Sequence, residues 1–344
     1  MWLKSVVLST VLVAVKGSTV FENGPRIAGY FSMKEPTLYS YLRKANTSPQ
    51  DGGSLSTYCS QNTTDIIPLA FIQSLSSEPV AAWGGDFTAE EVKGCQDQGK
   101  TIMVSLGGSL YMEGGWSTVA EAQASAQKLY AAYGPSGKTL ATNGFDFDFE
   151  VPMSNLVAFT KEIIDLRKKD GKDGQFFLTA APGCWYPDPN MGSVLTPHLD
   201  WFDAIFVQFY GAPGCGIPAG YQKRSTKLNS RSKIMKRSFN LETWLLLASE
   251  SITTQQIDDS NQVTPAGLAL SGQGNGTTKI FVGVPGSQAG TVSPNQGYVD
   301  APTLLTALSP YLKNKNFGGV SIWTIQLAVE NSGFLGLLRK GLAR

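Results

Sequence analysis

Histidine is nearly missing from this chain, whose 344 residues include only one, His198. A Ser-His-Asp hydrolase needs a histidine with organised partners, and nothing in the sequence organises around His198, which we interpret as a surface residue. Cysteine is also scarce, with four residues and no C-x-x-C pair. One histidine and no such pair argue against a zinc site, and we expect neither a metal nor a cofactor.

Other signatures are absent as well. The chain has no G-x-G-x-x-G motif and no P-loop, so nothing indicates nucleotide binding. A formal net charge of +1 gives no reason to expect nucleic acid or a charged membrane as a partner. The C-terminus carries a short amphipathic helix pattern, Leu335–Leu342, instead of a hydrophobic anchor tail. We therefore expect a monomer without a membrane anchor.

Residues 1–17 are typical of a secretory signal peptide. Lys4 gives a positive start, and Val6–Val15 form an apolar stretch too short to span a bilayer. The alternative is a buried N-terminal strand or helix. An even number of cysteines and three N-x-S/T sequons, at Asn46, Asn62 and Asn275, agree with secretion and glycosylation. We expect the mature chain, residues 18–344, outside the cell or in the cell wall.

Eight short β-rich apolar runs alternate with helix-like or polar stretches. Helices are predicted at Ala120–Tyr133, Asn155–Lys169 and Thr303–Leu312. This alternation predicts an α/β protein with a parallel sheet, and eight repeats favour a single-domain (β/α)₈ TIM barrel over an open doubly wound sheet. The predicted strands are Ile27–Phe31, Ile66–Ile72, Thr101–Leu106, Gly144–Glu150, Phe176–Ala181, Ala204–Tyr210, Lys279–Val284 and Gly319–Thr324.

The fourth predicted strand carries three acids. Because side chains alternate along a strand, Asp146, Asp148 and Glu150 share one face, and the phenylalanines between them share the other. In a barrel the phenylalanines would pack outward, and the acids would rise inside towards the C-terminal rim, where active sites of such barrels lie. Repulsion and desolvation raise the pKa of at least one acid of such a row, which suits a general acid. A calcium or magnesium site and an exposed strand edge are the alternatives.

Four ordered stretches resemble glycoside hydrolase family 18. The segment NGFDFDFE at 143–150 resembles that family's D-G-x-D-x-D-x-E signature, and TIMVSLGG at 101–108 resembles its S-x-G-G motif. The runs FFLTAAPGCWYPDP and FVQFYGAPGC are similar to the plant and fungal class III, hevamine-like chitinases, and GGVSIW resembles the last strand of the family barrel. The likeness extends from about residue 26 to 335.

The resemblance implies a chitinase, which hydrolyses β-1,4-linked N-acetylglucosamine polymers with net retention. Glu150 would protonate the glycosidic oxygen, while Asp148 would orient the N-acetyl group and share a proton with Asp146. The nucleophile would be the acetamido oxygen of the substrate, giving an oxazolinium intermediate. Chitin or chito-oligosaccharides would then be the partner.

The resemblance also implies the residues that hold the sugar. Tyr210 would hydrogen-bond the acetamide, Gln208 would contact the sugar, and Trp323 would stack beneath it. Taken alone, Tyr210 and Trp323 are as consistent with core packing. Gly107 and Gly108 would allow close backbone approach, and we place both with Tyr30 among the substrate-binding residues.

Two disulfides are expected. Cys59–Cys95 would join the segment before the second strand to the helix before the third, and Cys184–Cys215 would join the loops after the fifth and sixth strands beside the cleft. Each would stabilise the fold by roughly 2–4 kcal/mol.

The sequence departs from the family pattern in three places. Asn143 replaces the first acid of the signature, where an amide can still hydrogen-bond, and AGYFSMKEP replaces a W-G-Q-N-like loop, which bears on the outer non-reducing-side subsites. A basic stretch at about 222–238 has no counterpart. The rival functions are a chitin-binding lectin or glycosidase-inhibitor protein on the same barrel, and a metal-dependent hydrolase that a chelator would silence.

The basic stretch gives the first testable prediction. Residues Lys223–Arg237 include seven basic residues and no acid, and without them the formal net charge would be −6. Such a segment repels itself and buries little, so we expect an inert insertion or a mis-spliced segment, with a basic flap near the cleft as the alternative. Deleting Gln222–Arg237 should preserve soluble yield and tetramer hydrolysis. A variant that fails to fold would show that the segment is structural.

Overall fold

The computed structural model describes residues 20–22, 24–32, 54–61, 63–83, 87–212, 215–217, 241–249, 276–291 and 297–343. The signal-peptide prediction, the three sequon asparagines and the basic stretch all lie outside these residues. None of the helices within the described part is long and apolar enough to cross a membrane.

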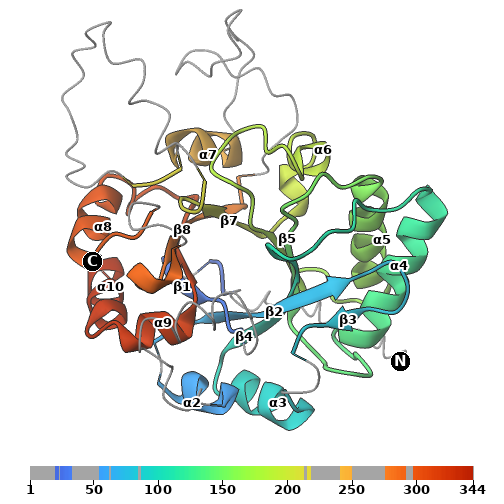
Figure 1. Cartoon of the computed structure of the whole chain (residues 1–344), viewed down its shortest axis with the longest axis horizontal. Coiled ribbons are helices and arrows are strands. Elements are labelled where there is room, and N and C mark those ends of the chain that lie inside the picture. The colour runs from blue at the N-terminus through green and yellow to red at the C-terminus, as the bar shows by residue number, and fades with distance from the viewer. Residues whose placement is uncertain are drawn as a thin grey trace, which may run out of the picture.

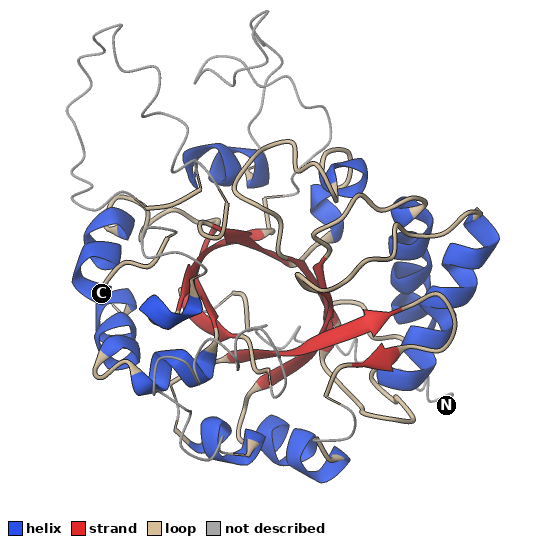
Figure 2. Cartoon of the chain, in the orientation of Figure 1, coloured by secondary structure: helices blue, strands red, loops and turns tan. Residues whose placement is uncertain are grey.

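Eight parallel strands close into a ring, with helices around its outside (Figures 1 and 2). The first strand pairs with both the last and the second, so the sheet is a barrel, and the open doubly wound alternative is wrong. A ninth, two-residue strand, β3, pairs antiparallel with β2 at the edge. The strands are β1 (Arg26–Gly29), β2 (Ile66–Ser74), β3 (Val80–Ala81), β4 (Thr101–Gly107), β5 (Gly144–Asp148), β6 (Phe177–Ala180), β7 (Ala204–Gln208), β8 (Lys279–Pro285) and β9 (Phe317–Trp323).

All eight predicted strands are confirmed, with changes at their ends. Two of these changes bear on the site, because β5 ends at Asp148 and β7 at Gln208, each two residues earlier than predicted. Glu150 and Tyr210 therefore lie just beyond the strands, where the chain turns outward at the C-terminal rim.

The helices pack around the ring. They are α2 (Leu55–Ser60), α3 (Ala89–Asp97), α4 (Val119–Tyr133), α5 (Leu156–Lys169), α6 (Gly192–Leu195), α7 (Leu241–Ala248), α8 (Ala301–Leu308), α9 (Ile325–Glu330) and α10 (Phe334–Leu342), with short 3₁₀ turns at Leu199–Trp201 and Gln288–Gly290. Thr88 and Thr118 begin α3 and α4 with capping boxes to Glu91 and Glu121, which explains why α4 begins before the predicted Ala120. The prediction Thr303–Leu312 was shifted, since Asp300 caps α8 and starts it earlier.

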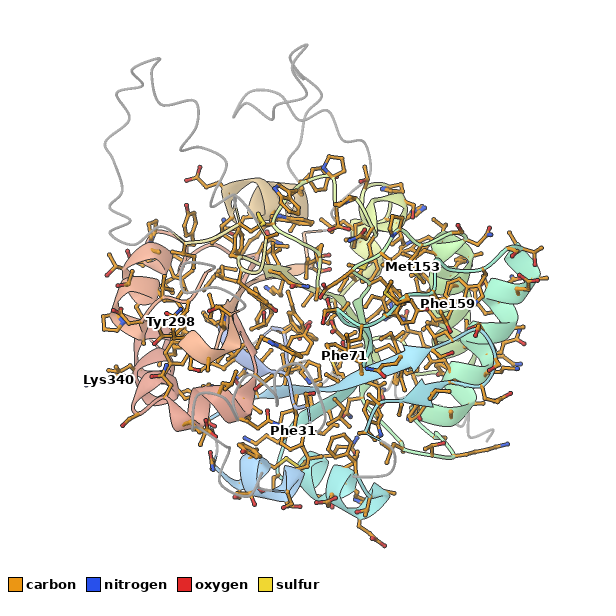
Figure 3. The ribbon with its side chains drawn as sticks, in the orientation of Figure 1. Phe31, Phe71, Met153, Phe159, Tyr298 and Lys340 are labelled. Atoms are coloured by element: carbon orange, nitrogen blue, oxygen red, sulfur yellow. A yellow bond between two sulfur atoms is a disulfide. The ribbon has the colours of Figure 1, made fainter. Side chains whose placement is uncertain are left out.

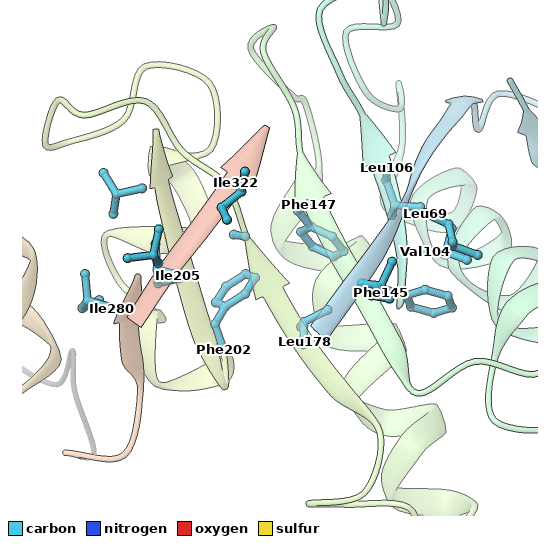
Figure 4. Close-up of a cluster of buried hydrophobic side chains, with 14 of the residues drawn as sticks. Leu69, Val104, Leu106, Phe145, Phe147, Leu178, Phe202, Ile205, Ile280 and Ile322 are labelled. Carbon is cyan, nitrogen blue, oxygen red and sulfur yellow. The ribbon is translucent and has the colours of Figure 1, made fainter. Parts of the chain in front are cut away.

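Apolar side chains form two separate layers. The larger lies between the ring and the helices and includes Phe145, Phe147 and Phe149, as alternation along the strand predicts. Figure 4 shows Phe145 and Phe147 among the side chains of this layer. Phe147 packs on Phe159 of α5 with ring centroids 5.7 Å apart. The smaller layer fills the barrel interior and includes Tyr30, Phe71 and Phe206. The interior is therefore a packed core up to the level of the acids.

At the N-terminal end of the barrel, polar residues that directly precede alternate strands form hydrogen bonds with the neighbouring strands. Asp65, Asn143 and Asp203 each accept a hydrogen bond from a backbone N–H of the preceding neighbour strand, at 2.9, 2.9 and 2.8 Å. The backbone carbonyl of each accepts from the following neighbour strand, at 2.9, 2.8 and 3.1 Å. Before β9, Asn316 donates through Nδ2 to the carbonyl of Thr278, at 2.9 Å. We call these four residues the base clamps.

Asn143 is thus a structural residue in a family-signature position. Its Oδ1 accepts from the Ile102 N–H and from Gln96 Nε2, at 2.9 and 3.0 Å. An amide oxygen serves here as well as a carboxylate would, which accounts for the departure from the signature.

The base clamp at Asn143 gives a stability prediction. Asn143→Ala leaves the buried Ile102 N–H without its acceptor and should lower the free energy of unfolding by about 1–3 kcal/mol, measured by urea denaturation. Asn143→Asp keeps the acceptor and is the matched control, expected near wild-type stability. Equal stability of wild type and Asn143→Ala would contradict the clamp.

Candidate active site

The acid row lies at the C-terminal end of β5. Asp146 and Asp148 are buried within the barrel, and Glu150, two residues beyond the strand, is exposed at the rim. The alternation predicted from the sequence is confirmed, because the three phenylalanines pack in the outer layer. The row therefore passes from a fully buried carboxylate to a solvent-accessible one.

Asp146 is enclosed by three hydroxyl groups. Tyr30 and Ser105 donate to Oδ2 at 2.8 and 2.7 Å, and Thr179 donates to Oδ1 at 2.6 Å. Burial raises the pKa of the Asp146 carboxyl, and the three hydrogen bonds oppose that rise. A carboxyl in this setting holds a proton more readily than an exposed aspartate.

Sequence reasoning missed Ser105 and Thr179. The strand register explains their position, because Ser105 and Thr179 are the cross-strand partners of Asp146 on β4 and β6. A signal was present, since each is a hydroxyl-bearing residue at an inward position between two apolar neighbours. Tyr30, predicted to touch substrate, is 3% exposed and its hydroxyl donates to Asp146, whereas its contact with a substrate stays a prediction.

Asp148 is held from its side chain and from its backbone. Gln208 at the end of β7 donates through Nε2 to Asp148 Oδ1 at 2.7 Å, and to the Ala181 carbonyl at 2.9 Å. The Gly108 N–H donates to the Asp148 carbonyl at 2.8 Å. The structure thus brings together Asp148 and Gln208, which the sequence analysis placed on separate strands of one site.

Gly107 and Gly108 make the close backbone approach that was predicted. Gly107 has φ of +112°, and a Cβ there would lie 2.2 Å from the Asp148 carbonyl oxygen. A Cβ on Gly108 would lie 2.6 Å from the ring of Phe71. The glycines therefore let β4 approach the Asp148 backbone and make room for Phe71, whereas their contact with a sugar stays a prediction.

Tyr210 lies half-buried two residues after Gln208. Burial raises the pKa of its hydroxyl well above the usual value, and the charges of Asp148, Glu150 and Asp146 raise it further. The hydroxyl therefore stays protonated and remains a hydrogen-bond donor beside the acid row.

Trp323 is partly exposed at the end of β9, on the opposite side of the ring from β5. Its ring stacks on Phe71 with centroids 5.5 Å apart and planes at 19°, and meets the edge of Tyr30 at 5.9 Å. Phe71 lies inside the ring of strands (Figure 3) and was not predicted as a site residue. We call the stacked rings of Trp323 and Phe71 the aromatic shelf, and it faces the acids across the barrel.

Both expected disulfides are present. Cys59 and Cys95 join α2 to α3, and Cys184 and Cys215 join the segments after β6 and β7, with Cα atoms 5.4 and 5.6 Å apart. Among the described residues, no group of three or more His, Cys, Asp or Glu side chains is arranged to hold a metal ion. His198, expected at the surface, is partly exposed and stacks on Trp201 at 3.8 Å.

A closed (β/α)₈ barrel with inward acids at the C-terminal end of one strand, faced by an aromatic shelf, has the site of a carbohydrate-cleaving barrel enzyme. Residues 26–328 match the model of glycosyl hydrolases family 18, and the chain belongs to this family.

Curated relatives agree with the family over most of the chain. Endochitinase 33 of Trichoderma harzianum is 29% identical over 309 residues, covering 81% of this chain and 83% of that protein. A class III chitinase of Arthroderma benhamiae is 30% identical over 308 residues, covering 81% and 82% of the two chains.

Similar solved structures carry different functions on this fold. A xylanase–α-amylase inhibitor protein, XAIP-I, has a TM-score of 0.65 at 21% identity, covering 92% of this chain and 98% of that one. A chitinase from Ipomoea carnea has a TM-score of 0.63 at 20% identity, covering 92% and 99%. At these identities the likeness shows the fold, and the function has to be argued from the site.

The buried Asp146 gives a pH prediction. A pKa raised by folding means that the folded state holds the proton longer, so the stability this group contributes is present below the ordinary carboxyl pKa of about 3.9 and is lost as the pH rises through the raised value. Asp146→Asn removes this dependence. The unfolding free energy of wild type minus that of the variant should therefore fall from pH 4 upward, measured by denaturant titration. A difference that rises with pH would contradict this assignment.

Proposed function

We propose that this protein is a chitinase that hydrolyses β-1,4 linkages of N-acetylglucosamine polymers, with Glu150 as its general acid and base. Membership of glycosyl hydrolases family 18 and the two chitinase relatives support the activity. The observation that carries it is the graded acid row, in which Asp146 is fully buried, Asp148 is tethered and Glu150 is exposed.

The first step is cleavage with the help of the substrate. Glu150 gives its proton to the glycosidic oxygen, and the acetamido oxygen of the sugar on the other side of the bond attacks the anomeric carbon. The leaving sugar departs as an alcohol, and an oxazolinium ion remains. The deprotonated Glu150 then takes a proton from water, whose oxygen attacks the same carbon and restores the sugar with retained configuration. Exposure of Glu150 at the rim supports this role, because substrate and water can both reach it.

Asp148 and Tyr210 would hold the acetamido group. The Asp148 carboxylate is fixed by Gln208, so it can accept the amide N–H of the substrate and stabilise the positive oxazolinium ion. Burial and the charges of the neighbouring acids raise the pKa of the Tyr210 hydroxyl, so it stays protonated and can donate to the acetamido oxygen. Asp146 would share a proton with Asp148 as the charge on the substrate develops.

Trp323 would carry the sugar that is attacked. Its partly exposed ring rests on Phe71, which fixes its plane opposite β5. Gln208 would contact the same sugar from its place beside Asp148. A flat apolar floor facing acids across the barrel suits a pyranose ring, which has an apolar face and a polar rim.

A non-catalytic carbohydrate-binding or inhibitor protein is the second candidate, favoured by the likeness to XAIP-I. The presence of Glu150, Asp148 and Tyr210 at one rim favours the enzyme. We also propose that residues 1–17 direct the chain out of the cell, that residues 18–344 are the catalytic domain, and that it acts as a monomer. The two disulfides are compatible with an extracellular location.

Replacing the proposed acid is the decisive test of function. Glu150→Gln keeps the shape of the side chain and removes the transferable proton, so hydrolysis of an N-acetylglucosamine tetramer should fall by at least about 10²–10⁴-fold, while calorimetric binding of the tetramer persists. Glu90→Gln makes the same change on the exposed face of α3 and should leave hydrolysis unchanged. Near-normal turnover by a folded Glu150→Gln variant would remove Glu150 from the mechanism. Tetramer binding by wild type without any hydrolysis would favour the second candidate.

A further inference from the structure

Trp185 is a large apolar side chain that the mechanism leaves unused. It lies in the segment between β6 and α6, and it is 42% exposed. Active sites of such barrels lie at the C-terminal rim, and a flat aromatic side chain exposed there can stack on the apolar face of a ligand.

The segment around Trp185 is firmly held. Cys184 before it is buried in the disulfide to Cys215, and Tyr186 after it packs edge-on against Trp244 at 5.3 Å. The buried Asp188 carboxylate accepts backbone N–H groups of three residues, Gly183, Asn190 and Met191, at 3.0, 2.9 and 2.7 Å. The exposed indole is thus presented by a fixed loop, so binding there requires little ordering of the protein.

Contacts place the indole beside the acid row. A Cβ added to Gly183 would lie 3.4 Å from the six-membered ring of Trp185, so the ring covers Gly183. Gly183 pairs as an isolated parallel bridge with Gln208, and Gln208 donates to Asp148. Two residues, Gly183 and Gln208, therefore connect Trp185 to a proposed substrate-binding carboxylate.

The side of the cleavage site follows from the order of the strands. β9, with Trp323, lies opposite β5 in the ring, whereas β6, which leads to Trp185, is the immediate neighbour of β5. The proposed acid Glu150 follows β5 and would protonate the oxygen that leaves with the departing sugar. A sugar bound beyond Glu150, away from Trp323, would be flanked by the loops that follow β4 and β6, the two neighbours of β5.

Both of those loops expose apolar side chains. Leu110 and Met112, in the segment after β4, are 42% and 80% exposed. A hollow of about 600 Å³ is lined by residues that follow Glu150 in the chain, including Pro152 and Ser154, and by residues that follow Trp185, including Pro187.

We propose that Trp185 is a stacking platform for N-acetylglucosamine units on the leaving-group side of the cleavage site. This inference rests on the proposed chitinase function. Trp323 and Trp185 then bracket the scissile bond, one under the sugar that is attacked and the other under the chain that departs. Trp185 sets how many sugars are held beyond the bond and so where a long oligomer is cut.

The test uses the full chain and a reducing-end-labelled N-acetylglucosamine hexamer. Trp185→Ala should raise the KM for the hexamer about tenfold with a smaller change in kcat, as expected for loss of an aromatic anchor. Its products, resolved by mass spectrometry, should shift towards cuts that leave fewer sugars on the labelled side. Trp185→Phe should restore most of the wild-type pattern. A merely structural role would not move the cleavage position.

Controls separate folding and function from the platform. Trp185→Leu keeps apolar bulk but loses the flat ring, so it should behave as the alanine variant does while unfolding at the wild-type temperature. Leu337→Ala, at an exposed position on α10, should change nothing. KM and product distribution of folded Trp185→Ala within twofold of wild type would overturn the proposal. If wild type hydrolysed nothing, the proposed function would fail. Calorimetric binding of the hexamer would still test the platform, and equal affinity of wild type and Trp185→Ala would refute it.

Discussion

The buried carboxyl of Asp146 is the constraint from which the order of the site follows. A carboxyl group at this depth is tolerated only when hydrogen bonds replace the water it has lost. Three strands must therefore deliver hydroxyls to one point, and they do so through Tyr30, Ser105 and Thr179. The register of β4, β5 and β6 is thereby fixed, because a slip of one residue would turn the hydroxyls away.

Above this point the site becomes progressively more open. Asp148 is held by one amide and by a backbone contact that only glycine at 107 permits. Glu150 comes after the strand has ended and faces solvent. Burial thus decreases along the same five-residue row in the order that the proposed chemistry needs, from a carboxyl enclosed by hydroxyls to a group that must meet both substrate and water.

The sequence was sufficient for the barrel and for the acid row, since both depend on periodicity along a single strand or on the alternation of strands and helices. It did not reveal the roles of Ser105, Thr179 and Phe71, because each role depends on contacts between strands distant in the chain, and a threonine in a strand is ordinary on β-propensity alone. Strand ends were also misjudged, since hydrophobic character continues through Phe149 and Phe209 after the ladder has ended.

The base clamps join the strands to one another at the N-terminal end of the barrel, opposite the end that carries the acid row. Asp65, Asn143 and Asp203 each accept one hydrogen bond through the side chain and another through the backbone carbonyl. Each residue therefore joins the two strands that flank the strand it precedes. Arg339 of α10, the last helix, donates to the Asp65 carboxylate at 2.7 Å and so connects this helix to the same end of the barrel. The loops at the C-terminal end take no part in these contacts. A change in one of those loops can therefore alter which ligand is bound while the contacts that join the strands at the base persist.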